Sequence, residues 1–171
     1  AAAMLLCTGV YAGTDLNEVG ALLVFPTIIV SDRVHDEANG ELETFVTITN
    51  AGPNDVVAHV SYINGKDDSQ YCYECDFSIP LSGNDTETLV ITRGANGIHI
   101  VAEDLPLDLS CPWKYGMMVV SLEDEDGGTI SDNVLLGEEV VVNYDQGTAF
   151  SIPAIPFQGS SNDGDRQFDF D

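Results

Sequence analysis

Basic side chains are scarce in this chain, which has 5 lysines and arginines among 171 residues. A protein that binds nucleic acid needs Lys and Arg to displace the counterions of the phosphates. Anionic membrane surfaces attract basic segments for the same electrostatic reason. We therefore expect no nucleic-acid partner and no binding to an anionic membrane surface.

Long apolar runs are missing as well. A membrane-spanning helix needs about 18 consecutive apolar residues. The apolar stretches at residues 1–10 and 20–30 are both shorter than this. We therefore expect no transmembrane span.

Catalytic motifs are the third absence. The nucleophile elbow G-x-S-x-G does not occur. The three histidines, His35, His59 and His99, lie on separate elements, and none has a nucleophile motif beside it. We predict that the protein is not an enzyme, although three histidines that met in space would form a metal site.

Acidic side chains dominate instead, with 29 Asp and Glu and a formal net charge of −24, while 44% of the residues are hydrophobic. Disordered acidic chains lack the apolar content for a core, so this composition predicts a folded domain with an acidic shell. The shell has three interpretations: binding of divalent cations, life at high salt, or a solvated surface that keeps the protein soluble.

A chain of this length fits one domain. We expect the domain to span residues 20–153. An apolar N-terminal segment, residues 1–19, precedes it, and an acidic tail rich in Gly, Ser and Pro, residues 154–171, follows it.

Apolar and polar side chains alternate on both sides of the turn-forming residues 51–55 in the stretch from Thr44 to Asn64. A period of two is typical of strands with one buried and one solvated face. We expect two strands here, with Val46 and Ile48 facing Val60 and Tyr62 across a core.

Similar short runs continue along the chain, and the proline in the run at 20–30 predicts a bend or an edge at Pro26. The runs at 138–144 and 148–152 predict a hairpin across the turn at 145–147. About eight to ten short strands without a helix predict an all-β fold, an antiparallel β-sandwich.

The four cysteines are Cys7, Cys72, Cys75 and Cys111, and the middle two form a C-x-x-C motif. A c-type haem would require His at position 76, which is Asp76. A thioredoxin-like pair starts a helix, and a structural zinc site needs a second ligand pair. We favour disulfide bonds among the four cysteines in an oxidising compartment. Sequence does not determine which cysteines pair.

The apolar run at residues 1–10 has three interpretations. It is the remnant of an export signal, because small residues follow it, or a segment that inserts into the sheet of a neighbouring copy. A lipoprotein anchor at Cys7 is less favoured, because the bulky Leu6 precedes that cysteine. All three interpretations predict a secreted, extracellular or cell-surface protein.

Two acidic segments are candidates for calcium, because carboxylate and carbonyl oxygens are the ligands that this ion prefers. Neither matches the EF-hand spacing, and we expect no other cofactor. The candidate ligands lie in the tail and in an acidic tip: Asp163, Asp165, Asp169, Asp124 and Asp126.

The aromatic residues Tyr71, Tyr73 and Phe77 flank the C-x-x-C motif. Exposed aromatic rings stack against sugars. Packing around a disulfide explains the same cluster equally well, so both interpretations stand.

Val46, Ile48, Asn50 and Gly52 follow the pattern V-x-V-x-N-x-G, with Ile in place of the second Val. In this stretch the sequence resembles immunoglobulin-like and CARDB-like β-sandwich modules of exported prokaryotic proteins. The resemblance implies an immunoglobulin-like scaffold without an active site, so it transfers no functional residue. The cysteines depart from the antibody pattern, because they do not bridge the two central strands.

Together these features predict a structural protein that is secreted or displayed on the cell surface. We expect it to form an extracellular filament or surface layer, a homopolymer assembled by strand pairing between copies. The alternative is an extracellular binding module for a carbohydrate or a protein ligand, with a requirement for calcium.

Overall fold

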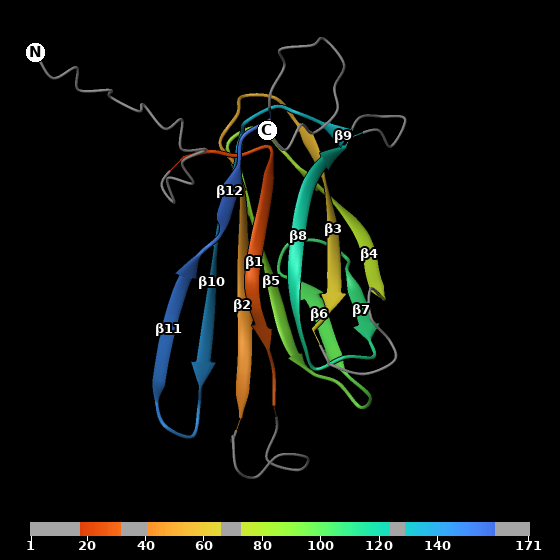
Figure 1. Ribbon diagram of the computed structural model, residues 1–171, viewed down its shortest axis with the longest axis vertical. Coiled ribbons are helices and arrows are strands. Elements are labelled where there is room, and N and C mark those ends of the chain that lie inside the picture. The colour runs from red at the N-terminus through yellow and green to blue at the C-terminus, as the bar shows by residue number, and fades with distance from the viewer. Residues whose placement is uncertain (1–17, 32–40, 66–72, 124–128, 160–171) are drawn as a thin grey trace, which may run out of the picture.

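The computed structural model describes residues 18–31, 41–65, 73–123 and 129–159 (Figure 1). These residues form strands β1 to β12 and no helix, so no helix that could span a membrane occurs among them. The strands form two antiparallel sheets. The predicted all-β fold of two packed antiparallel sheets is confirmed.

The first sheet, called the β1 sheet, has the strand order β12-β1-β8-β3-β4, with β9 paired to β8. Its strands are β1 (Leu22–Ile29), β3 (Val56–Asn64), β4 (Glu74–Leu81), β8 (Tyr115–Glu123), β9 (Thr129–Ile130) and β12 (Ile155–Phe157). Strand β12 lies in the segment that sequence assigns to the tail.

The second sheet, called the β2 sheet, has the strand order β11-β10-β2-β5-β6-β7. Its strands are β2 (Leu42–Asn50), β5 (Asp85–Arg93), β6 (Ile98–Ala102), β7 (Asp108–Cys111), β10 (Leu135–Asn143) and β11 (Thr148–Pro153). The predicted hairpin at 138–152 is confirmed as β10 and β11, which pair in antiparallel register from Glu138–Pro153 to Asn143–Thr148.

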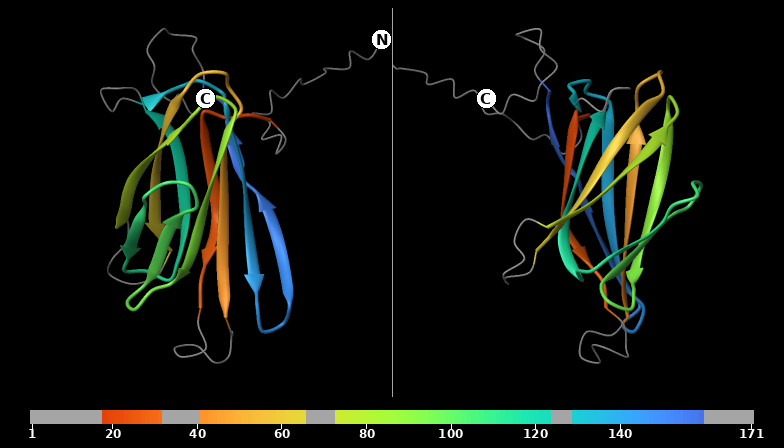
Figure 2. Two further views of the ribbon diagram at one scale, coloured as in Figure 1. Left: turned by 180° about the vertical axis from the view of Figure 1, so that it is seen from behind. Right: turned by 90° about the vertical axis from the view of Figure 1, so that its right-hand side faces the viewer.

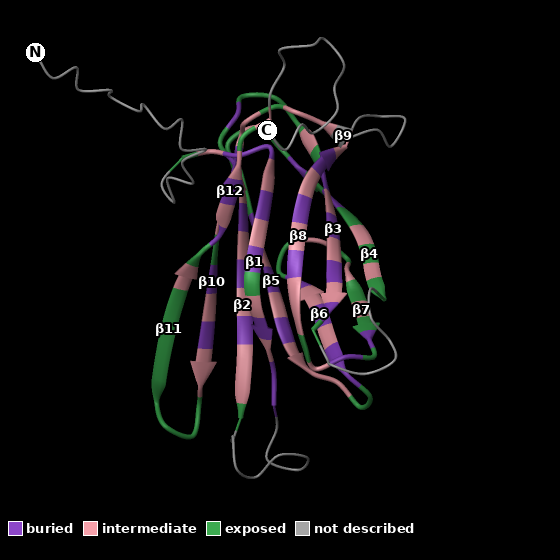
Figure 3. Ribbon diagram, in the orientation of Figure 1, coloured by how far each residue is buried: buried purple, intermediate pink, exposed green. Residues whose placement is uncertain are grey.

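The core lies between the two sheets and is built from every second residue of the central strands (Figure 3). Val46 and Ile48 of β2 and Val60 and Tyr62 of β3 are fully buried. Because β2 and β3 belong to different sheets, the prediction that these residues face each other across the core is confirmed. Each fully buried large apolar side chain adds about 1.5–3 kcal/mol to the free energy of unfolding.

The two sheets are joined at both sides of the sandwich. On one side a disulfide links Cys75 of β4 to Cys111 of β7, with a Cα–Cα distance of 6.1 Å. On the other side the chain passes from β11 to β12 at the buried Ala154, whose N–H donates to the carbonyl oxygen of Gly137 at 2.9 Å (Figure 2). The predicted disulfide bonding is confirmed for these two cysteines; Cys7 and Cys72 lie outside the described residues.

Strand β1 is irregular at the predicted proline, because its register with β8 shifts between Phe25 and Ile28. Strand β12 pairs only with the first half of β1. In the second half, side chains of the opposite sheet bind the backbone of β1: Thr44 Oγ1 donates to the Ile29 carbonyl oxygen at 2.7 Å, and Glu139 Oε2 accepts from the Thr27 N–H at 3.4 Å.

Glu139 is a carboxyl group inside the sandwich, and its side chain has no solvent exposure. Its Oε1 atom has no hydrogen-bond partner among the described residues. Burial raises the pKa of Glu139 above the usual value for glutamate, and the hydrogen bond from Thr27 partly opposes that shift. The carboxyl group therefore opposes folding when it is ionised.

We expect Glu139→Gln to stabilise the protein at pH 7 by roughly 1–3 kcal/mol, because it removes a buried charge and keeps an acceptor for Thr27. A raised folded-state pKa means that the folded state holds the proton more tightly. The contribution of Glu139 to the stability of the wild type is therefore greatest below the unfolded-state pKa of about 4.3. This contribution is lost as the pH rises through the folded-state pKa.

The measurement is urea unfolding of both proteins between pH 4 and pH 8. Glu138→Gln is the matched control, because Glu138 is the adjacent residue on β10 and its side chain is exposed. A Glu139→Gln protein with the wild-type free energy of unfolding at every pH would contradict the prediction.

Candidate functional sites

One end of the sandwich is organised by the buried side chain of Asn50, the last residue of β2. Its Nδ2 donates to the carbonyl oxygens of Asn54 at 2.7 Å and Ser82 at 2.9 Å, with a longer contact of 3.4 Å to Leu81. Its Oδ1 accepts from the N–H of Gly52 at 2.9 Å. This one amide therefore ties the β2–β3 turn to the end of β4 and the turn that follows it.

The β2–β3 and β4–β5 turns also contact each other directly. The N–H of Asn84 donates to the carbonyl oxygen of Gly52 at 2.8 Å, and that of Gly83 donates to Asp55 Oδ1 at 3.1 Å. A Cβ atom at Gly83 would lie 2.2 Å from the carbonyl oxygen of Pro53. Only glycine permits this approach, so the two turns pack directly against each other and form one rim.

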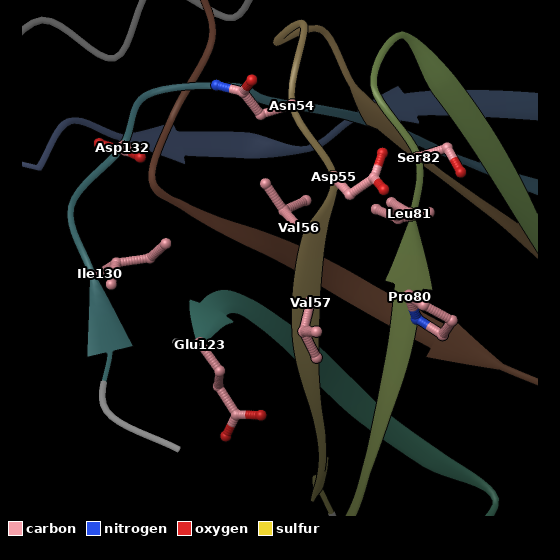
Figure 4. Close-up of a pocket in the computed structure, with 10 residues that line it drawn as sticks. All are labelled: Asn54, Asp55, Val56, Val57, Pro80, Leu81, Ser82, Glu123, Ile130 and Asp132. Carbon is pink, nitrogen blue, oxygen red and sulfur yellow. The ribbon is translucent and has the colours of Figure 1, made fainter. Parts of the chain in front are cut away.

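A pocket of about 460 Å³ lies beside this rim, within the size range of small-molecule sites (Figure 4). Apolar side chains from β3, the end of β4 and β9 line it together with three carboxylates and no basic side chain. The lining residues are Asn54, Asp55, Val56, Val57, Pro80, Leu81, Ser82, Glu123, Ile130 and Asp132. Such a surface suits a group that is partly apolar and positively charged.

Glu123 connects the pocket to His59 on the outer face of the β1 sheet. His59 Nδ1 lies 3.0 Å from Glu123 Oε1, and its Nε2 lies 3.7 Å from Asp76 Oδ1. Ser78 Oγ donates to Glu123 Oε2 at 3.1 Å. The serine hydroxyl is therefore bonded to a carboxylate instead of the imidazole, which is not the arrangement that activates a serine nucleophile.

The histidines do not meet among the described residues. His99 lies on β6 of the other sheet, with its Nε2 2.8 Å from Asp108 Oδ1, whereas His59 lies on β3. His35 lies outside the described residues. Within residues 18–31, 41–65, 73–123 and 129–159, no group of three or more His, Cys, Asp or Glu side chains is arranged to hold a metal ion. The five calcium candidates, Asp163, Asp165, Asp169, Asp124 and Asp126, lie outside these ranges.

The aromatic residues near the C-x-x-C motif lie beside the disulfide strands. The ring centroids of Tyr73 and Trp113 are 6.2 Å apart, and Trp113 also contacts the buried Tyr62 at 6.3 Å. Phe77 packs against the core, and Tyr71 lies outside the described residues. Of the two described members of the predicted cluster, Tyr73 is the exposed one, and its contact with Trp113 supports the interpretation as packing around the disulfide.

Strand β11 is the outer strand of the β2 sheet, and among the described residues it pairs only with β10 (Figure 1). Its six residues, TAFSIP, carry no charge. Phe150 stands opposite the buried Val141 and therefore lies on the inward face of the sheet, yet it is 53% exposed. No described strand of the other sheet covers β11 at this position, so both its face and its edge are open (Figure 3).

The other outer strands differ from β11. Strand β4 carries Glu74 and Asp76, β7 is only four residues long and carries Asp108, and β12 has three residues, whereas β11 has six residues and no charge and ends at Pro153. Charges and short length are among the devices that keep sheet edges from pairing with other chains. The sequence predicted strand pairing between copies at the chain ends and did not predict it at β11. An uncharged run in so acidic a chain was the signal for it.

No family model matches this chain, and no curated protein matches it. Among solved structures, the crystal structure of Thermotoga maritima 1070 is similar, with a TM-score of 0.49 and 11% sequence identity. The match covers 83% of this chain and 98% of the other.

Proposed function

We propose that this protein is a secreted or cell-surface structural protein whose copies associate through the open edge of β11. The observation that carries the proposal is the uncharged, exposed edge of this strand. Copies that each carry a net charge of −24 repel one another. An uncharged strand whose outer edge pairs with no described strand is where two such surfaces approach at the lowest electrostatic cost.

Export is part of the same proposal. The Cys75–Cys111 disulfide supports it, because disulfides persist in oxidising compartments. The apolar run at residues 1–10 supports it independently. A filament or surface layer is the assembled form that we propose for the exported protein, and it needs a second contact surface besides β11.

We also propose that the scaffold is a variant of the immunoglobulin-like sandwich. The central pairs β2–β5 and β3–β8 correspond to the pairs B–E and C–F of that fold. The outer strands are exchanged: β1 pairs with β8 and β10 pairs with β2, whereas the first strand of an immunoglobulin domain lies beside the second. A catalytic role is not part of the proposal.

The test of self-association is Phe150→Lys. A charge on β11 should prevent pairing, because the lysine would lose its hydration at the interface between the two copies. We expect the wild type to sediment as a larger species with rising protein concentration, and more so in higher salt, which screens the repulsion between copies. The variant should remain a monomer.

Tyr73→Lys is the control, because Tyr73 is 57% exposed, close to the 53% of Phe150, and precedes β4 at the opposite side of the sandwich. Its self-association should equal that of the wild type. A wild type that stays monomeric at all concentrations and salt levels would refute the proposed function.

A second function, that of a binding module, is favoured by the pocket beside the Asn50 rim. Its apolar lining and its carboxylates Asp55, Glu123 and Asp132 suit the side chain of a lysine on a protein ligand. The probe is the peptide Gly-Gly-Lys-Gly-Gly, followed by NMR shifts of the pocket residues, with the norleucine peptide as the neutral isostere.

Glu123→Gln combined with Asp132→Asn should weaken binding of the lysine peptide. The matched control combines Glu103→Gln with Asp104→Asn, which removes the same charge from the exposed β6–β7 connection, outside the pocket lining. Equal binding by both double variants would mean that binding of the peptide depends only on the net charge of the protein. That result would exclude the pocket as a specific site.

A further inference from the structure

We infer that β11 pairs with β11 of a second copy in antiparallel register, about a two-fold axis perpendicular to the sheet. The two β2 sheets then form one continuous sheet that runs through both molecules. This inference rests on the proposed self-association and specifies the geometry of the contact. It assigns the occupant of the open edge to an identical strand.

An identical strand is the best partner that this chain offers among its described edges. Pairing β11 with itself places no charged residue opposite another, because all six residues are uncharged. Pairing β11 with β4 would place the strand beside the charged side chains of Glu74 and Asp76. Strands β7 and β12 are too short to match six residues.

The open inward face of β11 favours the same geometry. A two-fold axis perpendicular to the sheet keeps the inward faces of both copies on the same side. Phe150 and Ile152 of one copy then lie beside Phe150 and Ile152 of the other; in the single molecule Phe150 is exposed and Ile152 is half-buried. The interface between the two β11 strands therefore removes apolar surface from water on one face of the sheet. It also completes backbone hydrogen bonds at the edge.

The acidic turns do not oppose this arrangement. Asp145 lies in the turn that joins β10 to β11, so antiparallel pairing points the two copies' turns in opposite directions. Six residues of strand at about 3.3 Å each separate the turns by about 20 Å. Charges this far apart are screened at physiological ionic strength, where the Debye length is about 8 Å.

The test exploits the identity of the two strands. Ser151 is exposed, and it pairs with Val140 on the outward face of β11. Ser151→Lys and Ser151→Glu should each weaken association, because each brings like charges together across the joint. An equimolar mixture of the two variants should form a mixed dimer roughly tenfold tighter than either variant alone.

The control uses the same pair of substitutions at Ser110, an exposed serine on β7, the other outer strand of this sheet. Both Ser110 variants and their mixture should associate as the wild type does. Wild-type association without recovery in the Ser151 mixture would overturn the two-fold β11 contact and leave the proposed self-association standing. A wild type that never associates would overturn both.

Discussion

Asn50→Ala is expected to lower the free energy of unfolding by roughly 3–5 kcal/mol. The side chain is fully buried, and it bonds to the backbone of both turns at its end of the sandwich. A neutral hydrogen bond contributes about 1 kcal/mol, and a buried group left without a partner costs about 1–3 kcal/mol. Alanine leaves the Gly52 N–H and the carbonyl oxygens of Asn54 and Ser82 without this partner, and it opens a cavity.

The measurement is urea unfolding, with a shift of the midpoint at an unchanged slope as the sign of lost stability. Asn50→Asp separates hydrogen bonding from volume, because it keeps the shape but has no N–H to donate to Asn54 and Ser82. It should be at least as destabilising as alanine. Asn96→Ala, at an exposed asparagine, should change stability by less than about 0.5 kcal/mol.

A small effect of both Asn50 substitutions would show that the two turns hold each other without the amide. The direct hydrogen bonds from Asn84 to Gly52 and from Gly83 to Asp55 would then be sufficient to hold the two turns together. The pocket next to the rim depends on the same contacts, so its ligand binding should weaken in parallel with the stability loss.

Replacing Cys75 and Cys111 together with alanine is expected to lower the free energy of unfolding by about 4 kcal/mol. The disulfide joins residues 36 positions apart, and cross-linking a loop of this length restricts the unfolded chain by that amount. It also joins the outer strands β4 and β7 of the two sheets. Its loss should therefore loosen this side of the sandwich first.

Wild-type protein reduced with dithiothreitol provides the internal control and should match the double variant in chemical denaturation. Hydrogen exchange should become faster in β4 and β7 before it does so in β2 and β5, which lie at the centre of their sheet. Uniform acceleration across all strands, or an unchanged midpoint after reduction, would contradict this prediction.

Much of the fold follows from local pattern. The alternation around Val46 and Val60 predicts strands whose inward faces the structure finds buried. Pro26 predicts the irregularity of β1, and the turn at 145–147 predicts the hairpin of β10 and β11. These features are local because side-chain direction in a strand repeats every two residues.

The candidate sites could be predicted less well. Asn50 and Gly52 stood in a recognisable motif, but the motif did not show that the amide reaches Ser82, 32 positions away in the chain. The pocket combines segments around Val57, Leu81 and Ile130, which no sequence window contains together. Both sites depend on contacts between turns, and turns carry little periodic signal.

The sequence by itself determined that the chain is acidic, that its strands have buried faces, and that its cysteines suit disulfide bonding. Only the tertiary structure decided that Cys75 pairs with Cys111, that Ala154 carries the chain between sheets, and that β11 is the open edge. Alternation reports which face of a strand is buried, whereas strand order depends on pairings between residues far apart in the chain. The edge that we propose for self-association is a property of that order.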